Sequence, residues 1–167
     1  MVYNTESNKD YIVRNVTIIG KFRELWLYYI LQGFLACITL SILIIILGKD
    51  KTVIISAMAA TAFIVFAMPT SVAAQTRNVI GGHLIGIITG TVFYYTHLPY
   101  YIEYPLVVGV AFFLMVALDF EHPPAAGTAL AVVINEVSLN VFPTIMIAAV
   151  VLSQCRYHLR HQLRNLV

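Results

Sequence analysis

The sequence predicts an all-α fold: a polytopic transmembrane helical bundle with five to six membrane segments and two broken helices. Hydrophobic residues make up 60% of the 167 positions and charged residues only 11%, and the mean hydropathy is +0.85. Soluble domains carry roughly 25% charged residues, so this composition excludes an ordinary soluble protein. Two proline-containing polar segments interrupt the apolar runs. We therefore expect membrane helices arranged around two breaks.

The apolar runs define the expected spans, because a membrane helix needs about 20 mostly apolar residues and roughly 17 to 25 is the working range. Residues 26–47 contain no charged residue and no signal-peptide cleavage pattern follows them, so we predict a retained first span. The other runs occupy residues 52–68, 79–95, 105–118, 124–135 and 141–157. The run at 105–118 is short for a bilayer. The run at 124–135 is shorter still, and it is either a thin sixth crossing or a re-entrant element.

Basic residues predict the orientation, since cytoplasmic flanks of membrane helices carry an excess of Lys and Arg. We expect residues 1–25 to form a cytoplasmic polar segment, residues 26–157 the transmembrane domain and residues 158–167 a basic C-terminal tail. A cytoplasmic tail requires an even number of crossings and places Arg77 inside as well. We therefore favour six crossings over five, in a multi-pass protein of the cell membrane with its N-terminus in the cytoplasm.

The two polar breaks resemble each other. The first, residues 68–78, contains Pro69, and the second, residues 119–127, contains Pro123 and Pro124. In both, proline lies at or just after the end of an apolar run, where it ends one helix and can begin another. Small residues follow in each case. This pattern is consistent with an internal repeat, and many transporters hold their substrate where repeated, discontinuous helices meet.

The first break carries the residues that we expect to bind an anion. Two helix N-termini that meet in a membrane present free N–H groups and the positive ends of two helix dipoles, and both favour negative charge. Arg77 adds a full positive charge, and Ser71, Gln75 and Asn78 can donate or orient hydrogen bonds. The predicted substrate-binding residues are Ser71, Gln75, Arg77, Asn78, His83 and His122.

The second break carries the residues that we expect to act as a gate. His122 can change its charge near neutral pH, which makes it a candidate gate or proton-coupled switch. Asp119 and Glu121 would repel an anion unless they pair with Arg77 or His122. The predicted gating or helix-breaking residues are Pro69, Asp119, Glu121, Pro123 and Pro124.

Glycines recur at intervals of four in the third apolar run, at Gly82, Gly86 and Gly90. Small residues at this spacing let membrane helices approach closely. We therefore predict that this run packs tightly against another helix.

These residues together resemble the HPP family of integral membrane proteins. Residues 119–127 read Asp-Phe-Glu-His-Pro-Pro-Ala-Ala-Gly, and residues 69–83 read Pro-Thr-Ser-Val-Ala-Ala-Gln-Thr-Arg-Asn-Val-Ile-Gly-Gly-His. Members of that family have been associated with nitrite transport, so the resemblance implies a carrier of nitrite or a related anion. The chain departs from the usual family pattern at Thr76, where proline is common, and at Glu121, where threonine is common.

The expected function is a transporter or channel for a small anion, with nitrite as the first candidate and with the lipid bilayer and further copies of the chain as partners. The alternative is a non-transporting accessory subunit of a larger membrane complex. A third interpretation, an enzyme that uses His122 with Glu121 or Asp119, lacks a nucleophile or phosphate-loop motif. We expect no enzymatic activity, no cofactor, no nucleic-acid partner and no metal site, since no histidines or cysteines have the spacing of metal ligands.

Overall fold

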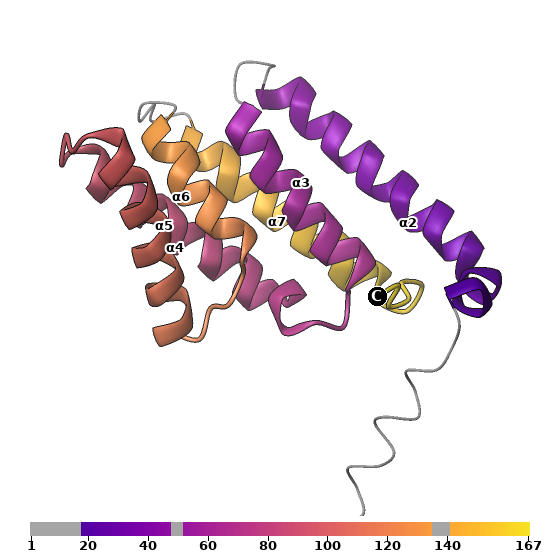
Figure 1. Cartoon of the computed structure of the whole chain (residues 1–167). Helices are drawn as coiled ribbons and strands as arrows, with labels where there is room; N and C mark the ends of the chain where they lie inside the picture. Colours follow the sequence, from indigo (N-terminus) through magenta and orange to yellow (C-terminus); the bar gives the residue numbers. More distant parts are fainter. Residues whose placement is uncertain (1–17, 48–51, 135–140) are drawn as a thin grey trace, which may run out of the picture.

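The computed structural model describes residues 18–47, 52–134 and 141–167, and all regular structure in these ranges is helical. The elements are α2 (Ile18–Leu47), α3 (Thr52–Ala67), the 3-10 turn η2 (Val72–Ala74), α4 (Thr76–Tyr94), α5 (Tyr100–Ala117), α6 (Pro124–Ile134) and α7 (Val141–Leu159). Figure 1 shows them packed side by side as a bundle, with α2 along one edge and α5 along the other. The predicted all-α fold class is confirmed for this part of the chain.

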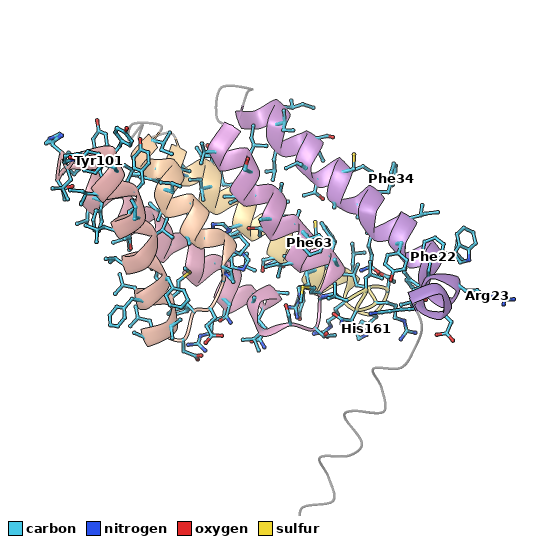
Figure 2. The ribbon with its side chains drawn as sticks, in the orientation of Figure 1. Phe22, Arg23, Phe34, Phe63, Tyr101 and His161 are labelled. Carbon is cyan, nitrogen blue, oxygen red and sulfur yellow. The ribbon has the colours of Figure 1, made fainter. Side chains whose placement is uncertain are left out.

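Two described helices are long and apolar enough to cross a membrane, namely Gly20–Ile45 within α2 and Tyr100–Ala117. Both are largely exposed, and large apolar side chains cover their outer faces. Phe22 and Phe34 on α2 and Phe112 and Phe113 on α5 are all exposed, and Figure 2 shows the two labelled phenylalanines on α2. An apolar surface of this extent suits lipid and not water.

The number of crossings stays a prediction. Apart from these two helices, Val53–Ala67 and Pro124–Ile134 are apolar but shorter than a full span. The structure therefore supports a helical membrane bundle without establishing the five to six crossings that we expected.

One expected boundary was wrong. The fourth run was expected to begin at Pro105 and to be too short for the membrane, but α5 begins at Tyr100 and has 18 residues, or about 27 Å at 1.5 Å per residue. Pro105 is the sixth residue of the helix, so its missing N–H removes the bond to the Tyr101 carbonyl, and the helix continues through it. The helix α2 begins at Ile18, so its first turns belong to the segment 1–25, and the division between a cytoplasmic segment and a transmembrane domain stays a prediction.

The centre of the bundle is the short helix α6, which has 11 residues and is about 16 Å long. It packs against α3, α4 and α5, and Figure 1 shows it in orange between α5 and α3. Most of its side chains are buried. The His-Pro-Pro segment therefore introduces a half-length helix that lies inside the protein.

The two breaks lie at the same end of the bundle because α4 and α6 run parallel. Gly82, Gly86 and Gly90 lie in turn beside His122, the Ala125 carbonyl and the Ala129 carbonyl, so residue numbers rise together along both helices. Both helices follow directly after a break, and Figure 1 shows the two connecting segments at the same lower edge.

The C-terminal segment folds back onto this end. Arg156 Nε donates to the Pro69 carbonyl at 2.7 Å, and the Leu166 amide donates to the Ala67 carbonyl at 2.9 Å. The buried side chain of Gln32 on α2 donates to the Arg164 carbonyl at 2.9 Å. The C-terminal arginines therefore share one end of the bundle with Arg77 and with both breaks.

Candidate functional site

Thr61 holds two histidines together in the interior. Its Oγ1 lies 2.9 Å from His83 Nε2 and 3.1 Å from His122 Nε2. The two imidazole ring centroids are 5.0 Å apart, and all three side chains are fully buried. We refer to His83, Thr61 and His122 as the histidine cluster.

The outer nitrogen of each ring also has a partner. His83 Nδ1 lies 2.8 Å from Thr128 Oγ1, and His122 Nδ1 lies 2.7 Å from the Ala73 carbonyl oxygen. Thr61 Oγ1 is in addition 3.0 Å from the Ala57 carbonyl oxygen. A buried polar group without a partner costs about 1–3 kcal/mol, so this complete pairing lets two histidines stay inside an apolar bundle.

The cluster connects five segments of the chain. Thr61 comes from α3, His83 from α4 and Thr128 from α6, while His122 belongs to the second break and Ala73 to η2 in the first. The bond from His122 to Ala73 therefore joins the two breaks directly. The structure brings together His83 and His122, which we had assigned to the same site, and it does so at the meeting point of the two broken helices.

Glycines make this approach possible. A Cβ atom on Gly82 would lie 2.7 Å from His122 Cβ, and one on Gly86 would lie 2.5 Å from the Ala125 carbonyl oxygen. Gly81 leaves similar room for the Phe120 ring. The predicted close packing of the glycine-bearing run is confirmed, and its partner is α6.

The second break begins with a helix-ending turn. The Phe120 amide donates to the Met115 carbonyl at 2.8 Å, and the Asp119 amide donates to the Val116 carbonyl at 3.2 Å. Asp119 has a φ of +59°, the left-handed conformation that closes many helix C-termini and that Asp and Asn tolerate better than most residues. This turn ends α5 and directs His122 inward.

Arg77 and Asp119 form an ion pair on the outer side of the cluster. Arg77 Nη1 donates to Asp119 Oδ2 at 2.8 Å, and the side chains are 56% and 73% exposed. The Arg77 guanidinium also lies 4.7 Å from the centroid of the Phe120 ring. Arg77 is therefore at the surface and spans the two breaks, and the pairing with Asp119 that we considered is the one observed.

The other polar residues of the first break mainly shape it. Ser71 Oγ accepts from the Ala74 amide at 3.2 Å and caps η2, while Asn78 Nδ2 donates to the Val72 carbonyl at 3.0 Å. Asn78 Oδ1 is buried and has no hydrogen-bond partner among the described residues. Gln75 is exposed beside the start of α4. Of these, the Asn78 oxygen and the Gln75 amide have unused hydrogen-bonding capacity.

The His-Pro-Pro segment lies between two hollows. One, of about 270 Å³, is lined by Phe112, Met115, Val116, Glu121, His122 and Pro123. The other is more open, about 560 Å³, and is lined by residues of α3 together with Pro123 and Pro124. Pro69 is buried in the first break, and its carbonyl holds Arg156. His122 thus reaches a hollow on one side and the buried cluster on the other.

The described residues contain no group of three His, Cys, Asp or Glu side chains arranged to hold a metal ion. The two described cysteines, Cys37 and Cys155, are free thiols.

Sequence reasoning missed Thr61, Thr128 and the Ala73 carbonyl. Both threonines lie in apolar runs, where a hydroxyl commonly bonds the carbonyl four residues earlier in its own helix. Thr61 does approach the Ala57 carbonyl in this way. A polar residue on the inward face of a membrane helix is a signal that could have indicated a hydrogen-bond partner. The sequence alone does not identify that partner as a histidine.

The comparisons with known proteins agree with this architecture. The family described as "HPP, transmembrane region" matches residues 20–161. A transmembrane protein of Dictyostelium discoideum is 36% identical over 93 residues, which cover 53% of this chain and 33% of that protein. The chain thus spans about a third of the length of this curated relative. No solved structure matched the chain. Since the family match covers most of its length, the chain belongs to the HPP family of membrane proteins.

Proposed function

We propose that this protein transports a small anion across the membrane and that nitrite is the first anion to test. The observation that carries the proposal is the parallel start of α4 and α6 at one end of the bundle. The N-terminus of a helix carries about half a positive charge and exposes N–H donors. At the start of α6, Pro124 has no N–H and the Ala125 and Ala126 amides donate to the His122 and Pro123 carbonyls, so this end contributes its dipole and not free donors. Together with Arg77, the positive ends of the two helix dipoles favour an anion. Nitrite is suggested by the resemblance to the HPP family.

The ion pair of Arg77 with Asp119 fits this role. Exposed ion pairs contribute only about 0–1 kcal/mol, because water screens them and ordering two side chains costs entropy. An incoming anion can therefore take the place of Asp119 on Arg77, with Gln75 as a further donor. In this proposal Asp119 is the counter-ion of Arg77 until the anion replaces it. A carboxylate beside the site is therefore compatible with anion binding.

His122 is the proposed gate between this surface and the interior. It lines the hollow of about 270 Å³ and bonds to both the first break and Thr61. The exposed Phe112 and Val116 line the same hollow from α5. A second copy of the chain packed on α5 would close it, in keeping with the expected homo-oligomer. The basic end of the bundle faces the cytoplasm in this proposal.

Anion flux into proteoliposomes tests the function. We expect wild-type protein to carry nitrite faster than chloride, nitrate or formate, and faster than protein-free vesicles, which report passive leakage of nitrous acid. No flux of any anion by protein that is monodisperse and thermally stable would contradict transport and favour the accessory-subunit alternative.

Substitutions in the ion pair should act in opposite directions. We expect Arg77→Gln to raise the KM for nitrite roughly tenfold, because a charge-assisted hydrogen bond is worth about 1.5–3 kcal/mol. Asp119→Asn should lower KM a fewfold, since it removes the competing carboxylate while Asn keeps the left-handed conformation. Arg23 is an exposed arginine on α2 and provides the matched control. Arg23→Gln removes the same positive charge as Arg77→Gln and should leave KM unchanged. An increase in KM for Asp119→Asn would show that the pair is structural.

A further inference from the structure

The hydrogen bonds of the histidine cluster form one continuous chain whose direction follows from its last acceptor. A carbonyl oxygen only accepts, so His122 Nδ1 must carry a proton and donate to Ala73 at 2.7 Å. In a neutral His122 ring, Nε2 then has a lone pair and needs a donor. Thr61 Oγ1, at 3.1 Å, is the hydroxyl that can supply it, with its hydrogen directed to His122 and not to the Ala57 carbonyl at 3.0 Å.

The same reasoning assigns the other ring. The single hydroxyl hydrogen of Thr61 is used on His122, so Thr61 can only accept from His83 Nε2 at 2.9 Å. His83 therefore carries its proton on Nε2, and its Nδ1 accepts from the Thr128 hydroxyl at 2.8 Å. The neutral cluster thus contains two different tautomers: Nδ1–H on His122 and Nε2–H on His83.

We infer that this cluster is a binding site for one proton, in which the Thr61 hydroxyl passes the proton between the two rings. When His83 gains a proton on Nδ1, its Nε2–H bond breaks as a Thr61 O–H bond forms. The original Thr61 O–H bond breaks as an Nε2–H bond forms on His122. The positive charge moves from His83 to His122, and Thr61 ends with one hydrogen, as it began. Every ring nitrogen keeps its partner, because the two bonds to Thr61 and the bond between His83 Nδ1 and Thr128 all reverse direction.

The cluster holds one proton and not two. The ring centroids are 5.0 Å apart, so two imidazolium rings would repel each other strongly in an interior of low dielectric.

The surrounding charges indicate on which side the proton leaves the cluster. The described helices α3 and α6 contain no ionisable side chain. Near the cluster α4 contributes only Arg77, which pairs with Asp119. Arg156 on α7 binds the Pro69 carbonyl, and Glu103 on α5 bonds Thr96 at the opposite end of the bundle. Glu121 is exposed and lines the same hollow as His122. A proton passed from His83 to His122 therefore leaves on the side of the cluster where His122 lines this hollow.

The consequence for transport rests on the proposed function. If the protein carries an anion past His122, a proton on the cluster neutralises the anion's charge, and the two cross together. The proton site itself does not depend on that function, so it can be tested without any transport assay.

Nitrogen NMR of the full chain in lipid nanodiscs, with labelled imidazole rings, tests the site directly. His83→Gln and His122→Asn assign the signals among the five histidines. We expect His122 as the Nδ1–H tautomer and His83 as the Nε2–H tautomer at pH 8, and uptake of a single shared proton on acidification. The same tautomer on both rings, or two protons taken up independently, would overturn the inference.

Two substitutions at Thr61 separate the relay from simple packing. Thr61→Ser keeps the hydroxyl and should retain the two unlike tautomers and shared titration. Thr61→Val keeps the shape and should abolish both, so that each ring titrates separately. Unlike tautomers in a protein without anion flux would support the proton site and count against the proposed transport. Anion flux by a wild-type protein in which both rings have the same tautomer would support the proposed transport and count against the proton site.

Discussion

Gly86→Ala is expected to destabilise the protein by about 1–3 kcal/mol, the usual cost of overpacking a tight interior, although alanine is the better helix former. The new Cβ would lie 2.5 Å from the Ala125 carbonyl oxygen and 3.3 Å from the Ala129 amide nitrogen. Both are backbone atoms of α6, so no side chain can move aside and the two helices must separate. The separation would also pull His83 away from Thr128.

The matched control is Gly109→Ala on α5, where nothing lies within 4 Å of the added Cβ. In the same detergent or lipid, the midpoint of thermal unfolding of Gly86→Ala should lie about 2–10 °C below that of wild type. The midpoint of Gly109→Ala should equal that of wild type or be slightly higher. Equal midpoints for the two variants would mean that α4 and α6 do not pack as closely as described.

His122→Ala is expected to abolish selective anion flux and to lower stability as well. It removes a fully buried ring and leaves the Ala73 carbonyl without the His122 donor, whereas Thr61 keeps His83 and the Ala57 carbonyl as partners. Each unpaired buried group costs about 1–3 kcal/mol. Because the two breaks are held together by the bond from His122 to Ala73, we expect the end of the bundle that contains them to open.

His122→Asn separates the two effects. The asparagine amide can donate to the Ala73 carbonyl, but it cannot bind a proton or reach Thr61 as the imidazole does. We expect this variant to unfold within a few degrees of wild type and yet to lose proton-dependent flux. Wild-type flux in a well-folded His122→Asn variant would reduce His122 to a structural role. Flux assays and thermal unfolding of both variants on the same preparation provide the comparison.

Much of the architecture was predictable because proline and glycine act locally. Pro69 and the pair Pro123 and Pro124 indicated the two breaks, and the four-residue glycine spacing indicated a tight helix contact. The structure contains both features. The pairing of Arg77 with Asp119 was one of the options considered, since opposite charges in two polar segments that meet commonly pair.

The rest depended on packing that no local signal reveals. The role of Thr61 arises because α3 lies against α4 and α6, and its own sequence context is ordinary for a membrane helix. The start of α5 was misjudged because proline was treated as a boundary, whereas a helix tolerates it near its N-terminal turns. Arg77 stays the predicted anion-binding residue, but the sequence did not indicate that its salt bridge with Asp119 lies on the exposed side of the break.

The most direct test of the account is a simultaneous record of nitrite uptake and internal pH in proteoliposomes, for wild type and for Thr61→Val. The account predicts that wild-type uptake acidifies the lumen and accelerates when the outside is more acidic. Thr61→Val should lose this dependence, and protein-free vesicles report the passive background. Uptake by wild type that is independent of the pH gradient, or identical in Thr61→Val, would contradict a histidine cluster that binds the transported proton.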